Sequence, residues 1–546
     1  MGPDNRRILI ATVASVAILI LWSVTPWGRP KAPPPPRPAP TETTKAPAPA
    51  PPPGAAPAVP ATPPPPPNAP EELVKLSGPA FEAVLSSHGG AVKSLVLQGD
   101  KFRRASDRAD AAAQIDLVRV TKDQPYLLAL VASPELGGAP DVAADPAARA
   151  PMRIVARDAR SVAFEGRVGN VDVKKVFRLT DKPFELAVDV EVKGAASGGA
   201  IELLFPGHTP PSAHKGGLFS GPPLDVVRPV CRAGDKTERY DLGGDPGAEN
   251  LAGTVAWVGI DAGYFIAAAL PQEALGSCRF ERGPEKGSGL AALRIPVEGG
   301  TRIVSLTVYA GPKDLDALRG YGRAFDGAID YGAMARPFAF FARILLYVMR
   351  WFEKLVGNWG VAIILLTLLV KLLLYPLTAK SMKSMNEMRK LQPEIEKLKA
   401  KHGADKEKLN LATMQLYQQH KVNPLGGCLP MLLQLPIWFA LYATLQTSVE
   451  LYREPFLWMH DLTRHDPYFI LPVAMGLSSF AMQRISPQPA DNAQAKMMLY
   501  FMPIFFSVLM LFVPGGLTLY IFVNNVLSIA QQQFLMKRQT AVAKAA

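Results

Sequence analysis

Apolar residues are distributed unevenly along this 546-residue chain. Long apolar runs lie near the N-terminus and in the last third, whereas the region at 71–335 alternates apolar and polar positions in short stretches. The stretch at 184–192, Phe-Glu-Leu-Ala-Val-Asp-Val-Glu-Val, alternates at almost every position, which predicts a β-strand with one buried face. Because similar stretches recur between Gly, Pro and Asp turns, 71–335 is predicted to form a large antiparallel β-sandwich domain.

The apolar runs predict membrane spans. The segment at 356–378 has about the length that a helix needs to cross a bilayer, and it carries one charge, Lys371. Near the N-terminus, Arg6 and Arg7 precede an apolar run, so 1–27 is predicted to be an uncleaved transmembrane anchor. Four further apolar segments follow the Lys371 segment, at about 428–447, 468–483, 497–513 and 517–535. The predicted architecture is therefore a multi-domain membrane protein with six transmembrane α-helices, the anchor plus a five-helix core.

Charge predicts the orientation of these spans. The loop at 379–427 and the tail at 536–546 are rich in Lys and Arg, and basic segments next to spans usually stay in the cytoplasm. Both termini are therefore predicted to be cytoplasmic, with the β-sandwich on the other side of the membrane. The Pro/Ala-rich segment at 28–70 is predicted to be an extended linker outside the membrane. Much of the net charge of +12 lies beside apolar segments, which favours a lipid bilayer partner over specific DNA binding.

The segment at 336–355, just before the Lys371 span, has the pattern of an amphipathic helix. Basic residues fall on one face, and the opposite face carries Phe338, Phe341, Leu345, Val348, Phe352 and Leu355. This pattern predicts a helix that lies in the membrane interface. The alternative is a core helix of the β-sandwich domain.

The cytoplasmic loop at 379–427 is predicted to be a helical hairpin. Methionine and leucine recur at helical intervals up to His402 and Gly403, where a glycine stop is expected. Asp405 is placed to cap a second helix. Pro393 either kinks the first helix or restarts it.

Several polar residues interrupt the predicted spans. Polar groups that face lipid are costly, so we expect these residues to converge on a wet cavity in the inner leaflet. The candidates are Thr367, Lys371, Gln434, Ser478 and Asn524. For Lys371 the alternative is snorkelling to the headgroups, and for the others it is helix-to-helix hydrogen bonding.

The sequence lacks the motifs of hydrolytic or nucleotide-dependent enzymes. It has no G-x-S-x-G elbow, H-E-x-x-H pair or Walker A loop, and its histidines lack metal-ligand spacing. No enzymatic activity, cofactor or metal is therefore expected. Of the three cysteines, Cys231 and Cys278 lie in the β-domain that is predicted to be exported, where a disulfide between them is left open.

From 356 to 538 the chain closely resembles the YidC/Oxa/Alb family of membrane protein insertases, in its Gram-negative form with a large periplasmic domain. The resemblance is carried by motifs in the same order as in the family. They are Gly357-Asn358-Trp359-Gly360, Tyr375-Pro376-Leu377-Thr378, Leu391-Gln392-Pro393, Val422-Asn423-Pro424-Leu425-Gly426-Gly427-Cys428, Gln434-Leu435-Pro436-Ile437, Asp466-Pro467-Tyr468 and Pro514-Gly515-Gly516-Leu517.

The resemblance implies a hydrophilic groove that opens to the cytoplasm and to lipid. Lys371 occupies the position of a family cation that is usually arginine, which keeps the charge but not the bidentate fork. By the same match, Thr367 and Tyr520 resemble substrate-lining residues, and the hairpin resembles the region that first receives the substrate. The implied function is an insertase and chaperone for nascent membrane proteins, acting alone or with the Sec translocon and supplied by the ribosome and signal recognition particle pathway.

Two other functional classes remain open from the sequence. A membrane-anchored binding protein would use the β-sandwich to recognise a periplasmic ligand, and its truncated helical core would not restore insertion. A small-solute channel would show conductance when the purified protein is placed in bilayers.

Overall fold

The computed structural model describes residues 69–103, 113–194, 198–210, 226–243, 248–297, 299–332, 336–402, 405–420, 422, 429–485 and 500–545. These residues belong to one compact unit of the chain that begins at Pro64. The predicted anchor at 1–27 lies outside the described residues, as does the predicted linker up to residue 68.

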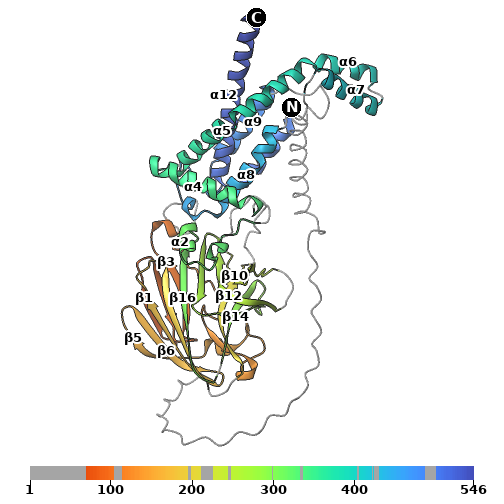
Figure 1. Cartoon of the computed structure of the whole chain (residues 1–546). Helices are drawn as coiled ribbons and strands as arrows, with labels where there is room; N and C mark the ends of the chain where they lie inside the picture. The colour runs from red at the N-terminus through yellow and green to blue at the C-terminus, as the bar shows by residue number, and fades with distance from the viewer. Residues whose placement is uncertain are drawn as a thin grey trace, which may run out of the picture. The chain divides into compact units, whose positions relative to one another are not determined.

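The β-domain is built from antiparallel strands in two sheets (Figure 1). The first sheet has three strands, β1 (Leu73–Ser77), β2 (Phe81–Ser86) and β3 (Ala91–Leu97). The second has thirteen, in the order β4-β9-β15-β14-β12-β13-β16-β8-β7-β6-β5, with β10 paired to β11 and β12. Its strands are β4 (Leu130–Ala132), β5 (Arg153–Arg157), β6 (Ser161–Val168), β7 (Val171–Leu179), β8 (Glu185–Gly194), β9 (Ala200–His208), β10 (Arg228–Ala233), β11 (Lys236–Arg239), β12 (Glu249–Ala262), β13 (Phe265–Pro271), β14 (Leu275–Arg282), β15 (Ser288–Pro296) and β16 (Gly300–Pro312).

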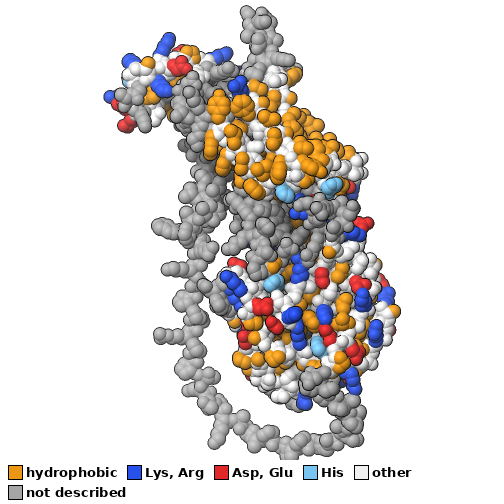
Figure 2. Space-filling view, turned by 180° about the vertical axis from the view of Figure 1, so that it is seen from behind, with side chains coloured by type: hydrophobic (Ala, Val, Ile, Leu, Met, Phe, Trp, Pro, Cys, Tyr) orange, Lys and Arg blue, Asp and Glu red, His pale blue; other side chains and the backbone are white. Residues whose placement is uncertain are grey.

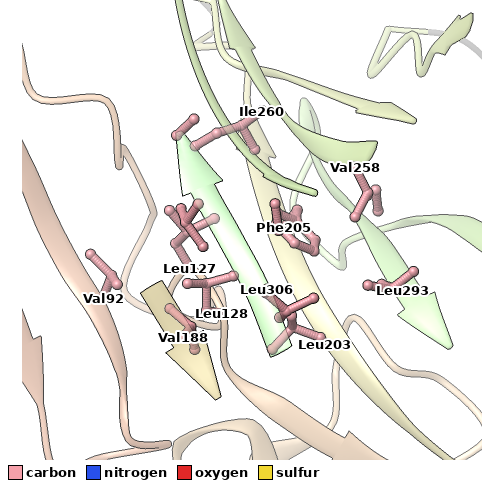
Figure 3. Packing of buried hydrophobic residues seen from close by; sticks show 14 of the residues in the cluster. Val92, Leu127, Leu128, Val188, Leu203, Phe205, Val258, Ile260, Leu293 and Leu306 are labelled. Carbon is pink, nitrogen blue, oxygen red and sulfur yellow. The ribbon is translucent and has the colours of Figure 1, made fainter. Parts of the chain in front are cut away.

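The alternating stretch at 184–192 forms β8, as predicted. Its apolar residues Leu186, Val188, Val190 and Val192 are all buried, because β8 pairs with β7 on one edge and β16 on the other and presents one face to the core. Figure 3 shows Val188 and Leu306 in this core together with Val92 of the smaller sheet. The two sheets therefore share one apolar core, in which each fully buried aliphatic side chain contributes about 1.5–3 kcal/mol.

The same core includes a residue from the helical part of the chain. Tyr452 is 1 % exposed, its ring centroid lies 5.4 Å from that of Phe265, and its hydroxyl donates to the carbonyl oxygen of Arg103 at 2.6 Å. Lys101 adds an ion pair with Glu454 at 2.7 Å. The loop that carries Tyr452 is thus inserted into the β-domain core.

The C-terminal part is helical, which confirms the broad prediction (Figure 1). Its helices are α4 (Ala339–Val356), α5 (Trp359–Lys390), α6 (Gln392–His402), α7 (Lys406–Gln419), α8 (Leu429–Thr447), α9 (Ile470–Ile485), α11 (Met502–Leu509) and α12 (Gly515–Ala545). A short helix, α2 (Leu315–Gly320), follows the last strand. The 3-10 turns are η2 (Asp100–Phe102), η3 (Pro134–Leu136), η4 (Pro146–Arg149), η5 (Phe325–Ala328), η6 (Arg336–Phe338), η8 (Val449–Leu451) and η10 (Met510–Phe512).

Within the described ranges, one helical stretch, Trp359–Met388, is long and apolar enough to cross a membrane. Ile470–Ile485 and Met502–Phe512 are shorter apolar helices. Figure 2 shows hydrophobic side chains gathered over the helical part, where Leu373, Leu477 and Phe512 are each at least 66 % exposed. A surface of this kind fits contact with lipid, and the count of six spans stays a prediction.

Helix α5 continues past Thr378, the predicted end of the span, to Lys390. Its backbone hydrogen bonds do not depend on where the surroundings change from apolar to polar, so the membrane boundary leaves no break in the helix. The chain then restarts as α6 at Gln392, with Pro393 in the first turn, where the missing N–H is not needed. The second hairpin helix, α7, begins as predicted, because the Asp405 carboxylate accepts hydrogen bonds from the backbone N–H groups of Glu407 and Lys408.

The predicted amphipathic helix is α4. Its Phe341 and Leu355 are exposed, whereas its Ala342 and Met349 are buried against the other helices. Leu346 of the same helix packs with a cluster of the β-domain. Helix α4 therefore contacts both parts of the chain and still exposes apolar side chains, and its location in the membrane interface stays a prediction.

The two cysteines of the β-domain, Cys231 and Cys278, are both buried and free, so the disulfide that the sequence left open is not present in this structure.

Candidate functional site

Lys371 points from α5 toward α12. Its Nζ donates a hydrogen bond to Ser528 Oγ at 2.7 Å, and Ser528 Oγ donates in turn to the carbonyl oxygen of Asn524 at 2.7 Å. The ammonium is therefore held between helices. This contact favours the interpretation in which Lys371 faces protein over the one in which it snorkels to the headgroups.

Lys371 also lines an open cavity of about 460 Å³, whose other lining side chains come from α5, α8, α9, α11, η10 and α12. A single water needs only about 10–15 Å³, so the cavity has room for many waters or for a peptide segment. Its polar lining consists of Lys371, Thr378, Gln434, Ser479, Gln483, Tyr520, Asn524, Asn525 and Ser528. Its apolar lining includes Trp438, Met475, Phe506 and Met510.

Two further polar contacts fix α12 beside this cavity. Gln434 of α8 donates from Nε2 to the hydroxyl of Tyr520. Asn525 Nδ2 donates to Ser479 Oγ at 2.8 Å and to Ser478 Oγ at 3.3 Å, which joins α12 to α9. Together with the Lys371–Ser528 bond, these contacts link α12 to three different helices.

The charge in the cavity is unbalanced. Among the described residues that line it, Lys371 is the one charged side chain, and no carboxylate lies among them. Such a cavity attracts anionic groups, because a partly desolvated cation without a counter-ion gains most from a negative partner.

Four of the predicted site residues meet at the cavity, namely Lys371, Gln434, Tyr520 and Asn524. Ser478 lies behind the lining, where its hydroxyl donates to the carbonyl oxygen of Met475 at 2.8 Å and accepts from Asn525. Its placement matches the alternative that the sequence left open, a hydrogen bond between helices.

Thr367 is not part of the cavity lining. It is 0 % exposed, and its hydroxyl donates to the carbonyl oxygen of Ile363 at 2.7 Å. It precedes Lys371 by one helical turn, so the helices are closely packed at that level and separate only further along α5. A direct substrate contact by Thr367 has no support from this geometry.

Ser528, the direct partner of Lys371, is not among the site residues predicted from the sequence. Its position could have indicated it, because Tyr520, Asn524 and Ser528 fall at i, i+4 and i+8 of one helix and so share a face. A serine in a helix most often bonds its own backbone, so its type alone does not mark it as a partner.

Clusters of three or more His, Cys, Asp or Glu side chains that could hold a metal do not occur in the part of the chain that the structure describes.

Comparison with known proteins finds relatives over almost the whole chain. The family model described as "60Kd inner membrane protein" matches residues 351–542, and the one described as "YidC periplasmic domain" matches residues 73–348. Membrane protein insertase YidC of Anaeromyxobacter sp. (strain K) is 69 % identical over 541 residues, covering 99 % of this chain and 98 % of the relative. Its counterpart in Geobacter sp. (strain M21) is 35 % identical over 473 residues, covering 84 % of each chain. A crystal structure of an active YidC insertase with its first transmembrane domain resolved is 18 % identical, with a TM-score of 0.37, and covers 84 % of this chain and 91 % of the other.

Proposed function

The chain belongs to the YidC family of membrane protein insertases, and we propose that it inserts nascent inner-membrane proteins through the polar cavity around Lys371. This membership favours insertion over the anchored binding protein and the solute channel. The single observation that carries the proposed mechanism is an uncompensated cation in a cavity of about 460 Å³ among apolar helices.

The cavity lowers the barrier for a polar segment of the client. A hydrophilic, often acidic, N-terminal tail or hairpin loop enters from the cytoplasm and is held near the Lys371 ammonium. The polar lining replaces part of the segment's hydration, so the distance that the segment must cross without polar partners becomes shorter. For an acidic tail that moves outward, the membrane potential contributes about 2.3 kcal/mol per charge per 100 mV.

The client's apolar helix leaves the protein sideways. Phe506 and Met510 of the α11 region line the cavity, and Phe506 is also 45 % exposed, so an apolar surface continues from the cavity to the outside of the bundle. Burial of the client's span in lipid then supplies the driving force, at about 25 cal/mol per Å² of apolar surface.

The topology that suits this mechanism has six spans, with both termini and the hairpin at 379–427 in the cytoplasm and the β-domain in the periplasm. The basic loop and tail support it. In the proposed domain map, the anchor is at 1–27, the linker at 28–70, the β-sandwich at 71–335 and the interfacial helix at 336–355. From its membership of the family, we also propose that the chain works with the Sec translocon and receives clients from the ribosome and signal recognition particle pathway.

Substitution at Lys371 tests the electrostatic capture. In cells depleted of their own insertase, full-length wild type, Lys371→Glu and Lys371→Arg are compared on one client made in two forms, with an acidic tail and with the same tail carrying Asn and Gln. Lys371→Glu is expected to impair the acidic form most, because it replaces attraction by repulsion, and Lys371→Arg to retain activity. Unchanged insertion of the acidic form by Lys371→Glu would refute the role of the charge.

A further inference from the structure

We propose that Ser528 is a positioning residue that holds the Lys371 ammonium in the cavity and thereby sets the preference for acidic clients. The inference rests on the proposed electrostatic function of Lys371. It assigns a role to a residue of α12 that lies 157 positions away in the sequence.

The Ser528 hydroxyl can only accept from Lys371. A hydroxyl has one hydrogen and two lone pairs. The hydrogen of Ser528 Oγ is donated to the Asn524 carbonyl oxygen, four residues back in the same helix, at 2.7 Å. Its lone pairs therefore remain for the Lys371 ammonium, at 2.7 Å, which is the length of a charge-assisted hydrogen bond.

This bond uses one of the three ammonium donors. Lys371 forms no ion pair among the described residues, so its charge is not cancelled. A serine is suited to this task, because a neutral acceptor orients the cation and a carboxylate in its place would neutralise it. The remaining donors are left for water or for the oxygens of a client's carboxylate.

The position of Ser528 does not depend on its own side chain. One turn and two turns before it, Asn525 is bonded to α9 and Tyr520 to α8, so α12 is fixed independently. Removal of the Ser528 hydroxyl should therefore leave the helices in place and free only the lysine. The four-carbon stem of a lysine without a partner samples other rotamers, including those that reach toward the headgroups.

The test uses the full-length protein in depleted cells, with the acidic and neutral forms of one client. Ser528→Ala is expected to lower insertion of the acidic form by about tenfold, the equivalent of one charge-assisted hydrogen bond, and the neutral form by less than about twofold. Ser528→Thr should restore insertion of the acidic form, because a threonine hydroxyl makes the same bond to the carbonyl four residues back.

Thr447→Ala is the matched control, because its hydroxyl also bonds back within a helix, to the carbonyl oxygen of Ala443 at 2.8 Å, and it does not line this cavity. It should leave both client forms unchanged. A double variant, Ser528→Ala with Lys371→Met, should insert the acidic form as Lys371→Met alone does, because Ser528 acts through the lysine.

The outcomes separate the two hypotheses. If Lys371→Met impairs the acidic form selectively and Ser528→Ala does not, the electrostatic function stands and the positioning role is overturned. Equal loss of both client forms in Ser528→Ala also overturns it, since that result marks a packing role. If Lys371→Met does not distinguish the client forms, both the proposed function and this inference fail.

Discussion

Lys175 places an amine in the interior of the β-domain, and its replacement by methionine should change how the domain's stability depends on pH. The side chain is 0 % exposed, and its Nζ donates to the carbonyl oxygen of Gly89 at 3.2 Å and to that of Leu128. The centroid of the Phe177 ring lies 5.6 Å from Nζ, and Lys175 forms no ion pair with a carboxylate among the described residues. Burial lowers the pKa of Lys175 to about 7.

The sign of the effect follows from proton binding. Between about pH 7 and pH 10.5 the unfolded chain keeps the proton on Lys175 and the folded chain tends to release it. The free energy of unfolding therefore rises with pH in this window, by about 1.4 kcal/mol per pH unit, and the contribution is constant below the window. At pH 7 the desolvated amine costs the folded protein about 4 kcal/mol relative to an unshifted lysine, and at pH 9 about 2 kcal/mol.

Lys175→Met removes this cost and introduces another. The carbonyls of Gly89 and Leu128 lose their donor, and each unpaired buried carbonyl costs about 1–3 kcal/mol. At pH 7 the gain from removing the desolvated amine and the loss from the two unpaired carbonyls nearly cancel, so the variant should be about as stable as wild type. Between pH 7 and pH 9 the wild type gains about 2 kcal/mol as Lys175 loses its proton, and the variant does not. The variant should therefore be less stable than wild type by about 2 kcal/mol at pH 9.

The free thiols of Cys231 and Cys278 provide the measurement, since both are buried and react only when the β-domain opens. Full-length protein in detergent is titrated with urea at pH 7 and pH 9, pulsed with a thiol reagent and read by mass spectrometry of each peptide. Leu186→Met, a neutral change at another fully buried position that keeps Lys175, is the control, and its stability difference from wild type should be the same at both pH values. If the stability difference between Lys175→Met and wild type is the same at both pH values, the amine is not desolvated and the reasoning is wrong.

Three further changes test other contacts. Tyr452→Ala should destabilise the β-domain by about 3–5 kcal/mol in the same thiol assay, because it leaves a cavity in the core beside Phe265. An unchanged urea midpoint would show that the loop carrying Tyr452 is not inserted into the β-domain. Asp261→Asn should cost about 3–5 kcal/mol by leaving Lys313, 2.6 Å away and also buried, without its counter-ion, and a loss under 1 kcal/mol would contradict the buried pair. Asp405→Ala should destabilise α7 by about 1 kcal/mol, because the helix loses its N-cap. The expected measurement is faster amide hydrogen exchange in α7 alone, and exchange equal to that of wild type would contradict the role of Asp405 as the cap.

The sequence by itself determined the elements that depend on nearby residues. Strand β8 was predictable because its alternation reflects one buried face, and α7 because Asp405 supplies acceptors for the first free N–H groups. The need for polar surroundings at Lys371 also followed from its chemistry, since a cation in an apolar helix must find water, protein or a headgroup.

Only the tertiary structure decided which groups meet. The partner of Lys371 is a serine 157 residues away, and Thr367, one turn from Lys371 on the same helix, is excluded from the cavity. The burial of Lys175 and the insertion of Tyr452 into the β-domain core were equally hidden, because the sequence around each residue is that of an ordinary strand or loop. Local periodicity reports which face of an element is buried, whereas the neighbours on that face come from distant segments whose packing no short pattern encodes.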